Sequence, residues 1–251
     1  MLQTAYSAAP AKYRCPAKIH RLTSREVFAA SLSEQALQRA PSDLFLSGNI
    51  ALAHATLRVS IVGSRAASPE GKRRAAKLAA VLASRGVVVV SGLAAGIDHS
   101  AHTAAIRAGG RTIAIIGTPL NRCYPARHAR LQEEIARDHL LVSQFKPESR
   151  VYPSNFVARN RTMAMLSHAS VIVEAGDTSG SLSQAAEIQR LGRPLFIMRN
   201  VVENTALKWP RSFLNSGAQI LDDVEQVLSA LSHGTCPQPQ GVQQLPLHGQ
   251  A

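Results

Sequence analysis

The stretch Arg58–Asp98, RVSIVGSRAASPEGKRRAAKLAAVLASRGVVVVSGLAAGID, decides the fold of this chain. Its first apolar run, Val59–Val62, has the length of a buried strand. Pro69–Ser84 follows with the spacing of an amphipathic helix, and its proline stands in the first turn, where no N–H is needed. Val87–Val90 is an unbroken β-branched run, typical of a strand covered on both faces. The stretch therefore predicts a strand, a helix and a second strand.

The same alternation continues along the chain. Further strands are predicted at Thr112–Ile116, Leu140–Val142, Val171–Val173, Leu195–Met198 and Gln219–Leu221. Further helices are predicted at Ala95–Ala108, Arg127–Asp138, Ser154–Ser167, Leu182–Leu191, Asn204–Asn215 and Asp222–Leu231. Strands that alternate with helices form a mostly parallel sheet with helices on both faces. We therefore expect an α/β domain over residues 58–231, with a doubly wound, mostly parallel sheet.

Two segments flank this pattern. Residues 1–57 are irregular and are expected to form a short N-terminal extension. Within it, Ser24–Gln38 predicts one or two short helices, and Pro41–Asn49 a turn or short extended segment. After Glu225 the sequence has no Asp, Glu, Lys or Arg, and residues 232–251 are rich in Pro, Gln, Gly and His. Such a tail cannot bury a core, and we expect it to be disordered.

Charge and cysteine content narrow the classes of partner. The formal net charge of +12 favours polyanions such as nucleic acid, although it also agrees with simple solubility. No apolar run reaches the length of a membrane span, and Met1–Arg14 lacks the apolar core of a secretory signal. Cys15, Cys123 and Cys236 are far apart and predict neither a zinc site nor a disulfide framework. We expect a cytoplasmic protein without a membrane partner.

Loops with glycines and hydroxyls follow four of the predicted strands. They contain Gly63-Ser64-Arg65, Ser91-Gly92 with Gly96, Gly117-Thr118, and Ser179-Gly180-Ser181. The carboxyl ends of parallel strands meet at one edge of a sheet, where α/β proteins bind ligands. Glycine lets the backbone approach an anion, and helix N-termini present free N–H groups. Tight turns need glycine in any case, but four such loops together predict a phosphate-binding edge.

The first of these loops lacks the GxGxxG fingerprint of dinucleotide-binding proteins. It offers Arg65 instead, whose guanidinium can bind phosphate oxygens in bidentate fashion. This argues against a nicotinamide or flavin enzyme, and we expect no cofactor.

Two basic clusters lie on predicted helices. The first contains Asn155, Arg159, Asn160 and Arg161, and beside a glycine-rich edge we favour phosphate contact over a solvated basic face. The second contains Lys72, Arg73, Arg74 and Lys77, for which a solvated outer face is expected, with long-range attraction at most.

Asp98, His99 and His102 invite a catalytic or metal-binding interpretation. Asp98 falls near a helix start, where a carboxylate stabilises free N–H groups. Two histidines without a third ligand make a poor zinc site. We therefore expect a capping role for Asp98, packing or hydrogen bonding for His102, and neither a metal site nor a catalytic residue.

The motifs, taken in order, resemble the DprA/Smf (DNA-processing protein A) family. The matching stretches are VSIVGSRAASPEG, VVVVSGLAAGIDHSAHTAAI, GGRTIAIIGTPLNRCYP, NFVARNRTMAMLS, VIVEAGDTSGSLSQAAEIQRLGR and PLFIM. They extend from about Val59 to Met198. Any one of them is weak alone, but the ordered set is highly specific.

The resemblance implies an extended Rossmann-like fold and a protein that is not an enzyme. It also implies binding of single-stranded DNA, loading of the RecA recombinase during natural transformation, and a homodimer. The family's DNA contacts carry over onto Gly63-Ser64-Arg65, onto Ser91, Gly92 and Gly96, onto Arg159-Asn160-Arg161 and onto Ser179-Gly180-Ser181.

The chain also departs from the family pattern. Family members often have an N-terminal helical domain and a C-terminal winged-helix domain, whereas here the N-terminal part is short and the Pro/Gln-rich tail stands in the place of the latter. The family's glycine-rich loop after the last matched strand is replaced by RNVVENTALKWP, Arg199–Pro210. We expect a shortened or divergent member.

Two alternatives involve a small nucleotide. The related LOG (lysine-decarboxylase-like) proteins cleave nucleoside monophosphates and have a PGGxGTxxE pattern, whereas this chain has Ser179-Gly180-Ser181-Leu182, with Glu187 offset on the helix. In such an enzyme Glu174 or Glu187 would be required. The second alternative is a nucleotide-sensing module, for which no effector domain is apparent. With aromatic residues at only 4%, we expect no long base-stacking platform and an affinity that comes mainly from phosphates.

Overall fold

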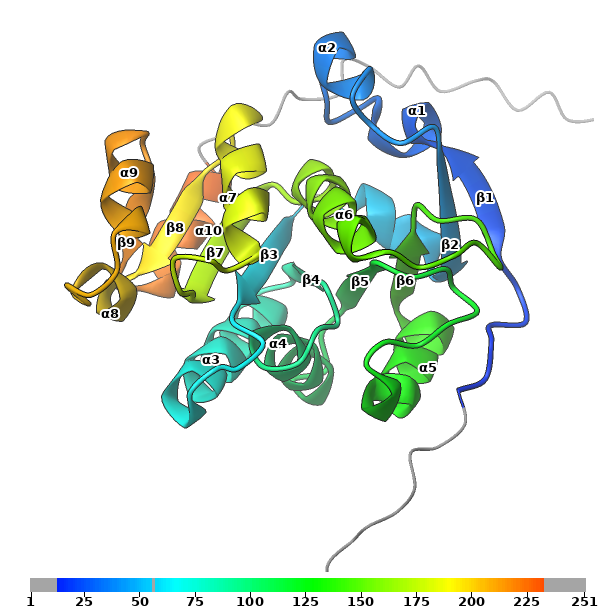
Figure 1. Cartoon of the computed structure of the whole chain (residues 1–251), viewed down its shortest axis with the longest axis horizontal. Coiled ribbons are helices and arrows are strands. Elements are labelled where there is room, and N and C mark those ends of the chain that lie inside the picture. The colour runs from blue at the N-terminus through cyan, green and yellow to red at the C-terminus, as the bar shows by residue number, and fades with distance from the viewer. Residues whose placement is uncertain (1–12, 56, 233–251) are drawn as a thin grey trace, which may run out of the picture.

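A computed structural model describes residues 13–55 and 57–232 of the chain (Figure 1). Within these residues nine strands form one sheet in the order β1-β2-β6-β5-β4-β3-β7-β8-β9. The strands are β1 His20–Thr23, β2 Asp43–Gly48, β3 Arg58–Gly63, β4 Val88–Ser91, β5 Thr112–Ile116, β6 Leu140–Ser143, β7 Ala169–Glu174, β8 Leu195–Met198 and β9 Gln219–Leu221.

Helices connect most of these strands. They are α1 Ser24–Phe28, α2 Glu34–Leu37, η1 Ile50–His54, α3 Pro69–Ser84, α4 Ile97–Arg107, η2 Ala126–His128, α5 Ala129–Asp138, α6 Pro153–Leu166, α7 Ser181–Arg190, α8 Arg199–Val202, α9 Trp209–Asn215 and α10 Val224–Ser232. The longest described helix, α3, begins where the sequence predicts, with the Ser68 side chain accepting from the Gly71 N–H and proline in its first turn.

The sheet is wound in two directions from its centre. From β3 the chain proceeds through β4 and β5 to β6, all parallel, and then returns to place β7 on the other side of β3, followed by β8 and β9. Among the described strands only the β1–β2 and β2–β6 pairings are antiparallel, so β2 alone runs against the others. The winding therefore reverses between β3 and β7, which is where open α/β sheets form a ligand crevice.

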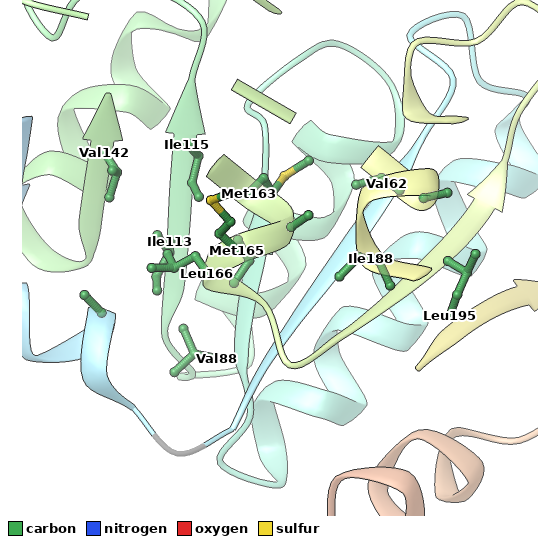
Figure 2. Packing of buried hydrophobic residues seen from close by; sticks show 14 of the residues in the cluster. Val62, Val88, Ile113, Ile115, Val142, Met163, Met165, Leu166, Ile188 and Leu195 are labelled. Carbon is green, nitrogen blue, oxygen red and sulfur yellow. The ribbon is translucent and has the colours of Figure 1, made fainter. Parts of the chain in front are cut away.

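Helices cover both faces of the sheet (Figure 1). Val88 and Val90 pack on the face covered by α6 and α7, whereas Val89, between them, packs on the face of α3 and α4. The α6 side chains Met163, Met165 and Leu166 lie over the strands in Figure 2. Alternate residues of a strand point to opposite faces, so a strand buried on both sides reads as a continuous apolar run. The predicted α/β, Rossmann-like, doubly wound fold is confirmed.

The N-terminal extension contributes more than short helices. The helices expected within Ser24–Gln38 are present as α1 and α2, but β1 and β2 add two antiparallel strands to the sheet beside β6. Within β2, Leu44 and Leu46 are fully buried. The spacing of these two leucines, two residues apart, is typical of a strand, but the pattern is short and lies between turn-forming residues. The sheet therefore includes strands from both sides of residue 57, at which the sequence predicts the end of the N-terminal extension.

Two details near the C-terminus differ from expectation. The helix predicted at Asn204–Asn215 begins only at Trp209, because Pro210 is tolerated in a first turn but not in a helix interior. The short helix α8 was not predicted. The predicted tail, apart from Ser232 at the end of α10, lies outside the described residues. Within the described chain, no helix has both the length and the apolarity to cross a bilayer.

Candidate functional site

A cavity of about 860 Å³ lies where the winding of the sheet reverses, beside the carboxyl ends of β3 and β7. Its walls come from the loops that follow β3, β4, β5, β6 and β7 and from one side of α6. They consist of Val62, Gly63, Ser64, Arg65, Ala66, Ala94, Asp98, Tyr124, Val151, Tyr152, Pro153, Phe156, Val157, Arg159, Asn160, Met163, Gly176, Thr178, Ser179, Gly180 and Ser181. The loops that follow β3 and β7 therefore face one another across this space.

The loop after β3 carries the exposed cation of the cavity. The pairing of β3 with β7 shifts register between Val62 and Gly63, so the strand leaves regular pairing where the loop begins. Ser64 is held by its N–H on the Glu174 carbonyl at 2.7 Å, and its hydroxyl accepts from the Ala66 N–H. The Arg65 guanidinium lies 5.3 Å from the centre of the Phe156 ring. No ion pair within the described residues involves Arg65, so its charge is available to a ligand.

The opposite wall is the loop after β7 and the N-terminus of α7. No side chain caps this helix at Gly180. The hydroxyls of Ser179 and Ser181 lie 2.7 Å apart at the cavity wall. The N–H groups of Ser181, Leu182 and Ser183 bond to the Ser179 hydroxyl and to the Ser179 and Gly180 carbonyls. The positive end of the helix dipole, together with the serine hydroxyls, attracts anions. This wall is therefore suited to a phosphate group.

The divergent segment after β8 supports this loop from behind. The Asp177 carboxylate accepts from the backbone N–H groups of Lys208 and Trp209, at 3.0 and 3.1 Å. The indole N–H of Trp209, which is buried, donates to the Ala175 carbonyl. The segment that departs from the family pattern thus fixes the loop that presents Ser179 and Ser181.

The loop after β4 is arranged differently, around two buried opposite charges. Arg159 is only 4% exposed, and its guanidinium donates to the carbonyls of Gly92 and Ile115. The Asp98 carboxylate accepts from the N–H groups of Gly92 and Ala94, at 3.1 and 3.3 Å. The peptide groups of Gly92 therefore contact both charges, and the loop is fixed by them.

Glycine at two positions of this loop is required by space and by backbone conformation. A Cβ on Gly92 would lie 1.9 Å from the Arg159 Nη1 atom. Gly96 has φ +77°, and a Cβ there would lie 2.3 Å from the Ser64 carbonyl oxygen. At both glycines, the space that a side chain would need is filled by atoms of the protein and not by a ligand.

Burial shifts the pKa values of both charged groups. It lowers the pKa of Arg159 to about 10, against the opposing effect of Asp98, so the guanidinium stays charged at neutral pH. It raises the pKa of the Asp98 carboxyl, against the charge of Arg159 and the hydrogen bonds of the loop.

The residues predicted from the sequence to bind phosphate fall into two groups, those that line the cavity and those that lie outside it. Those that line the cavity are Gly63, Ser64, Arg65, Arg159, Asn160, Ser179, Gly180 and Ser181. Those outside it are Ser91, Gly92, Gly96, Asn155 and Arg161. Ser91 is fully buried and donates to the Ile61 carbonyl, so it serves the sheet. Arg161 is exposed, but it lies 3.9 Å from Glu187, away from the cavity.

Asn160 connects two walls of the cavity. It is buried, and its side-chain amide donates to the Gly180 carbonyl and to the Ser183 hydroxyl, both at 2.9 Å. It also accepts from the Arg159 Nε–H. The Arg159-Asn160 pair on α6 thus positions the loops after β4 and β7.

The aromatic residues of the cavity were missed. Tyr124, Tyr152 and Phe156 all line it, and they come from two segments far apart in the sequence. A low aromatic content gives no information on where aromatic residues gather. The only available signal was the position of Tyr152 and Phe156 at the start of a helix that already carried the polar cluster.

The carboxylates required by a nucleotide hydrolase are engaged elsewhere. Glu174 accepts from the N–H and hydroxyl of Ser68, at 2.9 and 2.6 Å, and so holds the start of α3. Glu187 lines a separate cavity of about 420 Å³ and pairs with Arg190. Within the described residues there is no group of three or more His, Cys, Asp or Glu that could hold a metal ion. Asp98 and His102 have hydrogen-bonding roles, His102 with the Thr112 hydroxyl at 2.7 Å.

Sequence comparison identifies relatives across most of the chain. The family described as DNA recombination-mediator protein A matches residues 21–232. DNA processing protein DprA of Streptococcus pneumoniae is 37% identical over 190 residues, which are 76% of this chain and 67% of that protein. Protein Smf of Escherichia coli is 36% identical over 195 residues, 77% of this chain and 52% of that protein. The chain thus spans between half and two thirds of the length of these relatives.

Solved structures agree with the sequence comparison. The crystal structure of DNA processing protein A from Streptococcus pneumoniae is similar with a TM-score of 0.73 and 33% identity, over 85% of this chain and 74% of that one. The same protein from Helicobacter pylori, described for its single-stranded DNA binding mode, has a TM-score of 0.74 and 28% identity, over 86% and 96%. A molybdenum cofactor binding protein from Rippkaea orientalis, at 18% identity and a TM-score of 0.51, shares the fold alone. The chain described here belongs to the DNA recombination-mediator protein A family.

Proposed function

We propose that this protein is a recombination mediator that binds single-stranded DNA, and that the phosphates of the strand occupy the cavity between the loops after β3 and β7. The observation that carries the proposal is the placement of Arg65, outside any ion pair of the described residues, opposite the N-terminus of α7 and its serine hydroxyls in the same cavity. A cation and a helix N-terminus that face one another form a site for a phosphate group.

Two further facts support the proposal. The net charge of +12 attracts a polyanion over long range. The Helicobacter pylori relative, whose fold this chain shares, is described for its single-stranded DNA binding.

Of the residues selected from the sequence, we propose direct contact for Gly63, Ser64, Arg65, Ser179, Gly180 and Ser181. Arg159 fixes the loop after β4, and Asn160 fixes the loop after β7. Ser91, Gly92, Gly96 and Asn155 shape the loops from within, and Arg161 contributes long-range attraction from outside the cavity.

The finer parts of the proposal rest on family membership. We propose that the protein loads a RecA-type recombinase onto the strand, acts as a homodimer in the cytoplasm, and catalyses no reaction. Hydrolysis of nucleoside monophosphates is the alternative, and the engagement of Glu174 with Ser68 argues against it.

The experiment compares Arg65→Ala with Arg74→Ala. Arg74 is exposed on α3 and does not line the cavity, so it controls for the loss of one positive charge. Binding of a labelled thymidine oligonucleotide is measured by fluorescence anisotropy at several salt concentrations, with duplex DNA and a mononucleotide in parallel. Loss of a charge-assisted phosphate contact of about 1.5–3 kcal/mol lowers the affinity of Arg65→Ala about 10- to 150-fold, and flattens its salt dependence by about one charge. Arg74→Ala stays within about threefold of the unmodified protein.

Equal affinities of Arg65→Ala and the unmodified protein for single-stranded DNA would contradict the proposal that the strand binds in this cavity. Release of free base from nucleoside monophosphates, abolished in Glu174→Gln or Glu187→Gln, would favour the hydrolase instead.

A further inference from the structure

A second cavity, of about 420 Å³, lies at the opposite edge of the sheet from the cavity between the loops after β3 and β7. His168 and Pro194 line it, and since they directly precede β7 and β8, the cavity stands at the amino ends of those strands. Its other walls come from residues 31–39 of the N-terminal extension, from Met165 near the end of α6, and from the last residues of α7 and α10. The volume falls within the range of about 300–1,000 Å³ that small-molecule sites occupy. We call this space the amino-edge cavity.

Arg193 joins the walls of the amino-edge cavity. Its Nη1 atom donates to the carbonyls of Ala164 and Met165 at the end of α6, at 2.9 and 2.7 Å. Its Nη2 atom donates to the Ser31 carbonyl at 2.8 Å. These bonds fix the N-terminal extension against the end of the sheet. The cavity is therefore a built feature of the fold and not a gap between loosely placed segments.

A buried carboxylate lines this cavity with one of its oxygens unused. The Glu187 side chain is 9% exposed, and its Oε2 atom pairs with Arg190 on the next turn of α7. Within the described residues no group donates a hydrogen bond to the Oε1 atom. A buried carboxylate oxygen without a donor costs free energy, because it has lost its hydration and gained no bond in exchange. Oε1 is therefore an acceptor that a bound molecule would satisfy.

Positive charge dominates the rest of the amino-edge cavity. Three arginines, Arg39, Arg190 and Arg193, line it, against the one carboxylate of Glu187. His168 adds no charge at neutral pH, because burial and two neighbouring guanidiniums lower its pKa to about 3. Arg39 is exposed, and the ion pairs found between described residues do not include it. Its charge is available to an anionic group.

The remaining lining restricts the kind of molecule that fits. Its apolar part includes Leu32, Ala36, Met165, Leu191 and Leu231. A matching ligand has an N–H donor for Glu187, an apolar body for these walls and an anionic group for Arg39. Because Glu187 lies on α7 and Arg39 follows α2, the donor and the anion belong to different parts of the ligand. A free amino acid carries its ammonium and carboxylate groups on one carbon and does not match, whereas a nucleotide does.

We propose that the amino-edge cavity binds a nucleotide whose base carries an exocyclic amino group, as adenine and cytosine do, with that group donating to Glu187 Oε1 and the phosphate bound by Arg39. A single vacant oxygen takes a single N–H. Guanine fits less well, because it presents a ring N–H beside its amino group and would need both carboxylate oxygens, of which Oε2 is engaged by Arg190. The site lies away from the cavity assigned to DNA, so it stands or falls separately from the proposed function.

The test is equilibrium dialysis of the full chain against AMP, CMP, GMP and two analogues of AMP that each lack one feature. Purine riboside 5′-monophosphate lacks only the amino group, and adenosine lacks only the phosphate. AMP and CMP are expected to bind. Each analogue is expected to bind about tenfold more weakly than AMP or worse, which corresponds to the loss of one hydrogen bond to a charged group. GMP binds more weakly than AMP, and AMP is recovered intact because no reaction is proposed.

Two variants locate the nucleotide. Glu187→Met keeps a side chain of similar length without the acceptor, so it lowers the affinity for AMP about tenfold and leaves that for purine riboside 5′-monophosphate unchanged. Arg39→Ala lowers the affinity for AMP by a similar factor and leaves that for adenosine unchanged. Arg74→Ala removes an exposed charge outside both cavities and binds AMP like the unmodified protein.

Urea unfolding shows that the variants are folded. Without nucleotide, Glu187→Met is expected to unfold at the same urea concentration as the unmodified protein or at a higher one, because it removes a buried acceptor that has no donor.

Four results would overturn the amino-edge site. They are no binding of AMP or CMP by the unmodified protein, equal affinities for AMP and purine riboside 5′-monophosphate, undiminished AMP binding in Glu187→Met, and displacement of AMP by a saturating thymidine oligonucleotide. The last result places the nucleotide in the cavity between the loops after β3 and β7. DNA binding by the same preparation leaves the proposed function standing in each case, so the two proposals fail separately.

Discussion

The loops after β3 and after β4 look alike in sequence and differ in the structure. Both follow buried parallel strands, both carry glycine and serine, and both lie at the carboxyl edge of the sheet. The loop after β3 presents Arg65 to an open cavity. The loop after β4 is filled by the buried guanidinium of Arg159, whose Nη1 leaves no room for a Cβ on Gly92.

The difference lies in what stands beside each loop and not in its glycine, since a Cβ on Gly63 would also meet protein atoms, the Glu174 carbonyl oxygen and the Ile97 Cγ1 atom, both at 2.6 Å. After β3 the space beside the loop is open to a ligand, whereas after β4 it is occupied by a side chain of the same protein. The two arginines, Arg65 and Arg159, accordingly affect different measurements. Substitution of Arg65 is expected to change the affinity for DNA, and substitution of Arg159 the stability of the fold.

The largest expected effect is that of Arg159→Met on stability. The change removes the buried positive charge that favours the Asp98 carboxylate and leaves the Gly92 and Ile115 carbonyls without their donor, which costs about 3–5 kcal/mol of unfolding free energy. Arg65→Met, at an exposed position, costs less than about 0.5 kcal/mol. Urea denaturation followed by circular dichroism measures both.

The double variant Arg159→Met/Asp98→Asn sharpens this contrast. Because it removes both charges, it recovers part of the loss, and the non-additivity measures the coupling between the two charges. If Arg159→Met unfolds at the same urea concentration as the unmodified protein, the two charges do not fix the loop.

The next effect concerns glycines in the two kinds of loop. Gly92→Ala forces its Cβ against the Arg159 guanidinium and is expected to cost about 1–3 kcal/mol. Gly180→Ala is its matched control, since a Cβ there meets no atom within 4 Å and the residue already has helical φ and ψ. Its unfolding free energy stays within about 0.5 kcal/mol. Equal costs at both positions would contradict the distinction between a filled loop and an open one.

The third effect is a pH dependence that belongs to the helix after β4. Burial lowers the pKa of His102 on α4 to about 3 from its ordinary 6.5, and the neighbouring His99 adds to the shift. Below pH 6.5 the unfolded chain therefore takes up a proton that the folded chain refuses, so stability falls as the pH falls. From pH 7 to pH 5 this one group removes about 2 kcal/mol.

His102→Gln is expected to lose that part of the pH dependence, while Arg65→Ala keeps the slope of the unmodified protein. Burial also lowers the pKa of His168 to about 3, so a residual slope remains in His102→Gln. Urea unfolding at a series of pH values gives the slopes, and identical slopes in His102→Gln and the unmodified protein would exclude His102 as the source.

The fold was predictable because its central strands are continuous apolar runs. The side chains of Val87–Val90 and Thr112–Ile116 can all be buried only where helices cover both faces of the sheet. The strands β5 and β8 have the bounds that the sequence predicts. β1 and β2 were missed because they pair antiparallel at the edge, where short strands carry little pattern.

The site was predictable only in part, because a sequence shows residue types and not their exposure. Arg65 and Arg159 stand in equally polar surroundings in the sequence, yet one is exposed and the other is 4% exposed. The contact of Arg159 with Gly92 joins residues far apart in the chain, and so does the gathering of Tyr124 with Tyr152. Such long-range contacts have no local signature.

The smallest expected effect tests the far wall of the open cavity. Ser179→Ala removes one of the paired hydroxyls before α7 and leaves the backbone N–H groups in place. A neutral hydrogen bond to phosphate contributes about 1 kcal/mol, so the affinity for single-stranded DNA falls about fivefold. Ser84→Ala is the control, because this serine lies at the far end of α3, where its hydroxyl donates to the Val81 carbonyl. The salt slope stays unchanged in both variants, since neither removes a charge. An unchanged affinity in Ser179→Ala would leave phosphate binding at this wall to the backbone alone, and the comparison between the two loops would then rest on Arg65.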